Sequence, residues 1–447
     1  MYGPLYRRVL QPTFERVVKG RRTLEYWNLA EERQWWSRER LEAFQLKALR
    51  NLLVHAFETC PYSRETWESQ RLDPSGLTSL EEFREWPLLT RELIRQNRTR
   101  IRSVVPYKMI SKSTGGSSSE PLHFDLNAAS HERRTAMMYR GYNWAGGAPG
   151  TKQLHVWGSH VGRVSPMQRW KQALHARIER RKIVSCFQIT PAKMRRHFRV
   201  LNRYRPQVIV AYTNPLYEFA RYLAEHNLRP FSPQSIIVGA EKLHDFQREV
   251  IEEVFRAPVF ETYGSREFML IGAECERHCG LHLSMDNLLV EILDDDGFPT
   301  PPGEEGNVVI TDLFNYGMPF VRYVNGDRAL SGFEVCPCGR GLPLLKQVVG
   351  RRLDVLETPD GRKISGEFFP HLMKEFPSVR RFQVVQKKID SITLRLVVDT
   401  DFSQADQAML LSEIYQCVGT AVDFQIELVD EIPLTRAGKL QVVARVT

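Results

Sequence analysis

Four short segments contain residue types that suit chemistry on phosphate. A tract rich in Ser, Thr and Gly runs from Ser111 to Pro121, and a Tyr-Gly-x-x-Glu sequence runs from Tyr263 to Glu267. Asn325-Gly326-Asp327 follows, and Leu434 to Lys439 lies near the end of the sequence. Small residues let backbone amides converge on an anion, a carboxylate suits a hard cation, and a lysine can neutralise charge that builds on phosphoryl oxygens. Together the segments predict a site for a phosphate-bearing ligand.

The tract before Pro121 is the expected phosphate loop. Its hydroxyl groups would add donors to those of the backbone, which suits phosphate oxygens. It is not a Walker loop, because no Gly-Lys-Ser/Thr closes it before a helix. A flexible Ser-rich surface loop is the alternative. The residues expected to contact phosphate are Ser113, Thr114, Gly115, Gly116, Ser117 and Ser118.

Strand-like and helical segments alternate through the middle of the sequence. Apolar runs at 154–157, 208–211 and 235–238 indicate buried strands, and helical periodicity covers 216–227 and 247–255. This alternation predicts an α/β fold in which helices cover a sheet. We expect this sheet in a large N-terminal domain, 1–350, with a helical lid over about 1–105 and the nucleotide and acyl site over 106–350.

A smaller domain is expected after residue 350. Strand-like segments at 382–385, 391–398 and 423–429 accompany a helical segment at 406–418. This pattern predicts a small α+β domain over 357–447, joined to the first by a hinge at 351–356. A length of 447 residues agrees with two or more folding units.

The cysteines indicate reduced thiols or metal ligands. Their number, seven, is odd, and the N-terminus lacks an apolar signal core, so we expect a cytoplasmic protein without a disulfide framework. Cys336-Pro337-Cys338 and the stretch Cys275–His282 are two short groups of ligand type that a long segment separates, as in closed zinc sites. Cys279 and His278 are alternative ligands, and buried thiols without metal are the alternative to a metal site.

The N-terminal segment combines cations with apolar residues. The formal net charge is +9, and six of the basic residues lie within the first 22 positions. The favoured interpretation is a solvated arm that packs its apolar residues on the main domain, and contact with an anionic membrane is the alternative. The longest apolar runs are too short to span a bilayer. We expect no nucleic-acid partner, and a homodimer is left open.

These segments together resemble those of the adenylate-forming superfamily, specifically the phenylacetate-CoA ligase-like branch that includes CapK-type proteins. Thr114–Pro121 is similar to the phosphate loop of that branch, with Ser119 at a position that is usually Gly. Tyr263–Glu267 is similar to the motif Tyr-Gly-x-Thr-Glu, with Arg266 in place of Thr. Phe320–Asp327 resembles the motif Tyr-Arg-x-Gly-Asp. The resemblance implies a large multi-layer adenylate-forming domain followed by a small mobile C-terminal domain.

The resemblance also implies roles in binding the nucleoside. The backbone of Gly239, Ala240 and Glu241 would lie along one face of adenine, and Tyr263, followed by Gly264, would stack on the other. Asp327 would accept hydrogen bonds from both ribose hydroxyls, although Asn-Gly-Asp is also a common turn sequence.

Three further residues acquire roles in the chemistry from the resemblance. Glu267 would coordinate a Mg²⁺ that bridges the phosphates, and Arg351 at the hinge would reach the ribose or the phosphates. Lys439 follows a segment similar to the Pro-x-Thr-x-x-Gly-Lys signature of the mobile domain. It would bridge the attacking carboxylate and the α-phosphate, and a solvated surface lysine is the alternative. Related ligases have a similar cysteine and histidine grouping, which favours Cys275, His282, Cys336 and Cys338 as ligands of a structural Zn²⁺.

The activity that the resemblance implies is adenylation of a carboxylic acid by ATP, followed by transfer of the acyl group to a thiol, expected to be coenzyme A. Trp157, Gly158 and Thr262 would line the acid pocket, although Trp157 as an ordinary core residue is an equal alternative. Transfer to an amine or hydroxyl group, for instance on a sugar, is the alternative activity. A nucleotide-binding scaffold without catalysis is the second alternative.

Overall fold

The computed structural model describes residues 2–113, 122–157, 166–185, 191–332, 335–351, 355–360, 363–365, 368–373, 376, 378–419, 421–433 and 443–445. The contacts within the chain divide it into two compact units. Among the described residues, those up to Val348 belong to the first unit and those from Val349 belong to the second. Each unit is described by itself.

Helices occupy the first hundred residues of the first unit. Ser37 begins the longest of them, because its side chain accepts a hydrogen bond from the Arg40 amide at 3.4 Å. Cys60 ends that helix, and Pro61 starts the next one at a position where a missing amide hydrogen does no harm. The helices are α1 (Tyr2–Leu5), η1 (Tyr6–Leu10), η2 (Thr13–Val18), α2 (Thr23–Arg33), α3 (Arg38–Thr59), α4 (Pro61–Ser69), α5 (Leu80–Phe83), α6 (Arg91–Gln96) and α7 (Arg98–Ile101).

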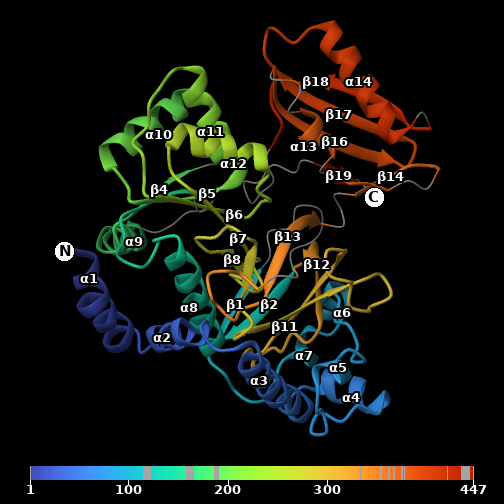
Figure 1. Ribbon diagram of the computed structural model, residues 1–447. Coiled ribbons are helices and arrows are strands. Elements are labelled where there is room, and N and C mark those ends of the chain that lie inside the picture. The colour runs from blue at the N-terminus through green and yellow to red at the C-terminus, as the bar shows by residue number, and fades with distance from the viewer. Residues whose placement is uncertain are drawn as a thin grey trace. The chain divides into compact units, whose positions relative to one another are not determined.

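One half of the main sheet is parallel and lies between helices (Figure 1). In β5, Ile209 and Ala211 pack with α11 and α12, whereas Val208 and Val210 pack on the opposite face with Ala145. Both faces of these strands are therefore apolar, as buried parallel strands require. The strands are β3 (Gln153–Trp157), β4 (Arg181–Ser185), β5 (Val208–Tyr212), β6 (Ser235–Gly239) and β7 (Val259–Tyr263). The helices of this half are α8 (Ala128–Trp144), α9 (Pro166–Ile178), α10 (Pro191–Tyr204), α11 (Thr213–Glu225) and α12 (Asp245–Phe255).

The other half of the main sheet follows β7. β7 pairs in parallel with β6 but antiparallel with β8, so the strand direction changes at β7. The order across the whole sheet is β10-β11-β12-β13-β9-β8-β7-β6-β5-β3-β4. The added strands are β8 (Gly272–Glu274), β9 (Leu281–Leu283), β10 (Leu288–Leu293), β11 (Glu305–Asp312), β12 (Tyr323–Ser331) and β13 (Leu344–Arg351). A separate antiparallel pair joins β1 (Met109–Ser113) to β2 (His123–Asn127).

The N-terminal helices share a core with the antiparallel strands. Leu49, Leu52 and Leu53 of α3 are fully buried and belong to the same apolar cluster as Leu289 of β10 and Leu313. Burial of several leucine side chains stabilises this contact by roughly 2 kcal/mol for each.

The second unit contains its own sheet and core. The strand order is β18-β17-β16-β19, with one antiparallel pair between β16 and β17 and parallel pairs on either side. Leu394, Ile414 and Phe424 lie in its apolar core. The elements are β14 (Val355–Glu357), β15 (Lys363–Ser365), α13 (Phe368–Met373), β16 (Val379–Lys388), β17 (Ser391–Val398), α14 (Gln404–Val418), β18 (Asp423–Leu428) and β19 (Val443–Arg445).

The predicted fold class is confirmed: a large α/β body is followed by a small sheet domain. Strand predictions at 154–157, 208–211 and 235–238 correspond to β3, β5 and β6. Among the described residues, no helix is long and apolar enough to cross a bilayer.

Candidate functional site

The parallel strands bring several predicted residues to one edge of the sheet. β3, β5, β6 and β7 run in the same direction, so their carboxyl ends meet at this edge. Their last residues are Trp157, Tyr212, Gly239 and Tyr263. Ligands of open α/β sheets bind outside the carboxyl ends of the strands, so this edge is the place to look for a nucleotide site.

The backbone turns sharply after β6. A Cβ atom on Gly239 would lie 2.5 Å from the Thr262 hydroxyl oxygen, so only glycine fits without a shift. Thr262 itself donates a hydrogen bond from its hydroxyl to the Val238 carbonyl at 2.7 Å. The next residue, Ala240, has a φ of +70°, a conformation that strains an L-residue by roughly 1 kcal/mol. Such strain is found at ligand sites, where the surrounding structure imposes it.

Hydrogen bonds hold the segment that follows this turn. The Glu241 carboxylate accepts from the Asn214 amide at 2.9 Å, and the Glu241 carbonyl accepts from the Thr213 hydroxyl at 3.0 Å. Both partners lie in the first turn of α11. The side chain of Glu241 therefore fixes the loop, while its backbone is the part expected along adenine.

Glu261 is a residue to which the sequence analysis assigned no role. Its carboxylate accepts from the Leu243 amide at 3.2 Å, and its own amide donates to Glu274 at 2.7 Å. Burial and the nearby Glu274 carboxylate raise the pKa of Glu261 to about 7. Glu261 thus connects β7 to the loop after β6. The sequence did contain a signal for such a role, because Glu261 is an acidic residue within the apolar run that precedes Tyr263.

Tyr263 and Asp327 contact one another directly. The Tyr263 hydroxyl donates to an Asp327 carboxylate oxygen at 2.8 Å. The Asn325 side-chain amide donates to the same hydroxyl at 2.8 Å and to the same carboxylate at 3.1 Å. The structure thus places the residue expected to stack on adenine beside the residue expected to bind ribose. Asn325 is a third member of this network that sequence reasoning treated only as part of a turn.

Asn325-Gly326-Asp327, a sequence that is also common in turns, does not connect two strands here. It lies inside β12, at a shift of register between the pairs Asn307–Arg328 and Val309–Val324. Two extra residues of β12 form a bulge there, and Gly326 adopts a φ of +85° that favours glycine. The Asn325 side chain accepts from the Asp327 amide at 2.9 Å and closes the bulge. A bulge of this kind can aim a side chain toward a ligand.

The loop after Tyr263 folds back, so that residues at its end contact residues at its beginning. A Cβ atom on Gly264 would lie 1.9 Å from the Met269 carbonyl oxygen, so this position accepts only glycine. The Ile271 amide donates to the Tyr263 carbonyl at 2.9 Å, and the Met269 amide donates to the Ser265 carbonyl at 2.8 Å. This compact loop carries Glu267.

Glu267 is buried, with two polar neighbours from distant parts of the first unit. The Tyr323 hydroxyl donates to its carboxylate at 3.3 Å, and an Arg91 guanidinium nitrogen lies 3.7 Å from the same oxygen. Burial and the Glu267 carboxylate raise the pKa of Tyr323, so the phenol remains a donor. Sequence reasoning missed Arg91 and Tyr323, because neither belongs to a motif that includes Glu267.

Cys275, His282, Cys336 and Cys338 form a compact cluster. Their ligand atoms all lie within 4.8 Å of one another, and all but Cys338 are buried. The Cys275 and Cys336 sulfur atoms are 3.6 Å apart, too far for a disulfide. The Cys338 sulfur lies 3.4 Å from His282 Nε2. The structure thus brings together the four residues favoured from the sequence, and three thiols with one imidazole suit Zn²⁺.

The surroundings of the cluster suit a metal. His282 Nδ1 lies 3.3 Å from the Leu342 carbonyl, which can only accept, so Nδ1 carries the hydrogen and Nε2 presents its lone pair to the sulfurs. Burial lowers the pKa of His282 to about 4, which keeps the imidazole neutral. The amides of Arg277 and Arg340 donate to the sulfurs of Cys275 and Cys338, each at 3.5 Å. Such bonds would stabilise thiolates.

The two alternative ligands lie elsewhere. Cys279 is exposed and donates to the Arg277 carbonyl at 3.3 Å. His278 Nδ1 lies 3.2 Å from the Glu274 carboxylate, and its ring contacts Phe260 with 4.6 Å between centroids. Neither belongs to the cluster.

Known proteins resemble this chain in sequence and in fold. Residues 356–446 match the model of the CapK C-terminal domain. Protein CapK of Staphylococcus aureus is 25% identical over 368 residues, which cover 79% of this chain and 78% of that protein. Phenylacetate-coenzyme A ligase of Thermus thermophilus is 26% identical over 333 residues, which cover 71% and 72%.

A solved structure with the same fold is that of 2-hydroxyisobutyryl-CoA ligase in the postadenylation state. It has a TM-score of 0.75 at 21% identity, and the match covers 93% of this chain and 91% of that one. The predicted resemblance to the CapK and phenylacetate-CoA ligase-like branch of the adenylate-forming superfamily is thus confirmed in sequence, and the solved structure confirms the fold. Several site predictions for this CapK-like chain lie outside the described residues, namely Thr114, Gly115, Gly116, Ser117, Ser118, Gly158 and Lys439.

The structure describes two further residues that were predicted as nucleotide-binding residues, Ser113 and Arg351. Ser113 ends β1, and its carbonyl accepts from the Arg266 guanidinium at 3.2 Å. The first residue that is predicted to contact phosphate therefore lies beside the loop that carries Glu267, and Arg266 makes this contact where the superfamily motif has Thr. Arg351 is the last residue of β13, in the second unit. The hinge prediction stays a prediction.

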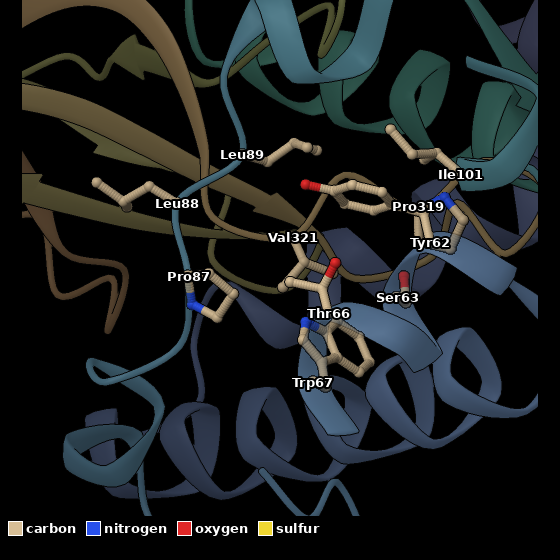
Figure 2. Close-up of a pocket in the computed structure, with 10 residues that line it drawn as sticks. All are labelled: Tyr62, Ser63, Thr66, Trp67, Pro87, Leu88, Leu89, Ile101, Pro319 and Val321. Atoms are coloured by element: carbon tan, nitrogen blue, oxygen red, sulfur yellow. The ribbon is translucent and has the colours of Figure 1, made fainter. Parts of the chain in front are cut away.

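Two of the residues predicted to line the acid pocket, Trp157 and Thr262, are described in the structure. Trp157 is half-buried against Tyr212, with 4.2 Å between ring centroids, and Thr262 contacts β6 as described above. A small cavity of about 30 Å³ lies elsewhere, between α4 and the segment 87–89 (Figure 2). It has room for about one water molecule, and neither Trp157 nor Thr262 lines it. This cavity is therefore no candidate for the acid pocket.

Proposed function

We propose that this protein uses ATP to adenylate a carboxylic acid and then transfers the acyl group to a thiol, with coenzyme A as the acceptor. The observation that carries the proposal is the network of Tyr263, Asn325 and Asp327, together with the strained turn at Ala240, which follows β6, the strand paired with β7. An aromatic ring opposite exposed backbone forms a flat slot for a purine, and an adjacent carboxylate suits the ribose hydroxyls. The names of the related CoA ligases support the same class of reaction.

The first half-reaction forms a mixed anhydride. An oxygen of the substrate carboxylate attacks the α-phosphorus of ATP, the bond from that phosphorus to the bridging oxygen breaks, and pyrophosphate leaves. Because anion approaches anion, the step needs positive charge at the reacting oxygens, which Lys439 would supply. Mg²⁺ held by Glu267 would neutralise phosphate charge when bound.

The second half-reaction transfers the acyl group. The sulfur of the thiol attacks the acyl carbon, the bond from that carbon to the phosphate oxygen breaks, and AMP leaves while the thiol loses its proton. A mobile second unit would let one site perform both steps, since closure over ATP and access for the thiol need different arrangements.

The four-residue cluster would hold Zn²⁺ in a structural role. Three cysteines and one histidine complete a tetrahedral shell and leave no open position for water or substrate. Bound zinc would connect β8 and β9 to the segment before β13, without taking part in the reaction.

The test is acid-dependent exchange of labelled pyrophosphate into ATP, over a panel that includes phenylacetate and 2-hydroxyisobutyrate. Exchange with at least one acid is expected, and Lys439→Ala should lower its rate by roughly 10²-fold. Lys387→Ala, at an exposed lysine of the same unit, is the matched control and should leave the rate unchanged. Comparing coenzyme A with amines and sugars as acceptors then decides the second step. Tight ATP binding without exchange for any acid would favour a non-catalytic scaffold.

A further inference from the structure

One side of α9 presents apolar residues to solvent. Met167, Trp170, Leu174 and Ile178 recur at spacings of three and four and therefore share one face of the helix. They are 62%, 62%, 43% and 40% exposed, respectively. Single exposed apolar side chains are ordinary, but a continuous row that includes a tryptophan indicates a binding surface.

The N-terminal arm lies beside this helix (Figure 1). The Tyr2 hydroxyl donates to the Ile178 carbonyl at 2.6 Å, and the Phe14 ring contacts His175 with 5.2 Å between centroids. The Arg180 guanidinium lies 5.2 Å from the centre of the Tyr2 ring. Because these contacts come from both α1 and η2 of the arm, the arm and α9 form one continuous surface.

The arm has a buried and an exposed face of its own. Tyr6, Gln11 and Glu15 are buried and recur every four or five residues, as the wide π-helical winding of η1 and η2 allows. The opposite side exposes a second apolar set, formed by Leu5, Val9, Val17 and Val18. Burial of Tyr6 agrees only in part with the arm predicted from the sequence, whose apolar residues were expected to pack on the main domain. This arrangement leaves the outer apolar residues without cover among the described residues.

The same two segments carry the positive charge of the protein. Residues 1–22 and 166–185 contain twelve Lys and Arg against two Glu, a formal charge of +10, whereas the whole chain has +9. Neither glutamate presents a free negative charge to solvent, since Glu15 is buried and Glu179 pairs with Arg181 at 3.0 Å. The charge that this surface shows to a partner is therefore almost wholly positive.

We propose that the arm and α9 dock the protein on the surface of an anionic phospholipid bilayer. Apolar side chains would enter the boundary between headgroups and acyl chains, and the surrounding Lys and Arg would contact lipid phosphates. A second copy of the chain is a poorer partner, because a two-fold interface would bring two surfaces of like charge together. A nucleic acid would match the charge but would leave the Met, Leu and Val side chains in water.

The test is co-sedimentation of the full-length protein with vesicles at low and high salt. Vesicles of phosphatidylcholine alone are compared with vesicles in which about a third of the lipid is phosphatidylglycerol. Binding to the anionic vesicles that weakens with salt is expected, together with little binding to the neutral ones. Absence of binding to anionic vesicles at low salt would overturn the proposal.

Two variants separate the apolar and charged contributions. Trp170→Ser and the double variant Lys171→Glu/Arg177→Glu should each weaken vesicle binding by about tenfold or more. The matched controls are Phe298→Ser, at another exposed aromatic residue, and Lys47→Glu/Lys346→Glu, with the same change of net charge. Both controls should bind like the unaltered chain. All six substituted positions are exposed, so the variants are expected to fold, which circular dichroism checks.

Other outcomes would also overturn the proposal. Equal loss of binding in patch variants and controls would indicate attraction by net charge alone. A dimer that Trp170→Ser dissociates would identify the surface as an interface between copies. Retention of RNA but not of vesicles would indicate a nucleic-acid surface. Each readout is independent of adenylation, so the proposed enzymatic function can fail or hold separately.

Discussion

The hydrogen bond from Tyr263 to Asp327 joins the two residues proposed to hold adenine and ribose. A ring that is oriented before the nucleotide arrives loses less conformational freedom on binding. Asn325 contributes to the same orientation, since its amide contacts both partners. Substitutions of Tyr263 can therefore test two effects separately, namely stacking by the ring and orientation of the ring by the network.

Removal of the Tyr263 hydroxyl should weaken nucleotide binding only moderately. Tyr263→Phe keeps the ring but deletes a hydrogen bond worth about 1 kcal/mol, so the KM for ATP in the exchange assay should rise by roughly two- to tenfold. Tyr263→Ala should have a larger effect, because stacking is lost as well. Tyr222→Phe is the control, since its hydroxyl contacts only Arg195 among the partners described for it. A KM unchanged in both Tyr263 variants would argue against the adenine role.

The buried acid Glu261 should make stability depend on pH. Its folded-state pKa of about 7 lies above the ordinary value of 4.5, so the folded protein binds this proton more strongly than the unfolded chain. The contribution of Glu261 is therefore most favourable at low pH and falls as the pH rises from about 4.5 to about 7.

Glu261→Gln isolates this contribution from those of other groups. The unfolding free energy of the variant, relative to the unaltered chain, should increase across that pH window by at most on the order of 3 kcal/mol. Denaturant titrations at several pH values measure the difference. Glu253→Gln, at an exposed position of α12, should show no such trend. A constant difference between pH 4.5 and pH 7 would disprove the assignment.

Zinc should connect elements that the antiparallel half of the sheet leaves loosely joined. The cluster unites Cys275, which follows β8, His282 of β9, and the Cys336-Pro337-Cys338 segment before β13. These elements pair through short ladders, with three residue pairs between β8 and β9 and two between β9 and β13. A metal that holds all of them would compensate for the small number of backbone hydrogen bonds.

Replacement of a cluster cysteine should remove this metal. The purified protein should contain about one zinc per chain, and Cys336→Ser should contain much less and unfold at lower temperature. Cys279→Ser is the matched control, because Cys279 is close in sequence but exposed and outside the cluster. Metal analysis by mass spectrometry measures the content. Equal zinc in both variants would contradict the ligand assignment.

Each of the two units has a separate apolar core. Leu216 and its neighbours occupy one core of the first unit, and Leu410 lies in the core of the second. Folding cooperativity follows such cores, so we expect two resolvable thermal transitions in calorimetry.

Matched core substitutions assign these transitions. Leu216→Ala and Leu410→Ala each remove a fully buried side chain and should destabilise their own unit by about 2–5 kcal/mol. Each variant should lower the midpoint of one transition and leave the other in place. A single transition that both variants shift would indicate that the chain unfolds as one cooperative unit.

Much of the architecture was accessible from the sequence, because it depends on local patterns. Buried strands such as Val208–Tyr212 are short apolar runs, and helices such as Asp245–Phe255 have a clear periodicity. Cysteine and histidine spacing likewise indicated a metal site, and the resemblance to related ligases favoured the four residues that form the cluster. Resemblance to a family added the proposed roles of Tyr263, Asp327 and Lys439, which no single pattern supplies.

Only the tertiary structure decided which distant side chains meet. Arg91 reaches Glu267, Asn325 reaches Tyr263, and the arm lies against α9, because strand order and helix packing bring together segments far apart in the sequence. The bulge in β12 was equally inaccessible, since Asn-Gly-Asp suits a turn as well as a bulge, and only pairing with β11 selects between them. Local residue preferences determine the elements of this protein, whereas contacts across the folded chain determine the neighbours of its candidate catalytic and binding residues.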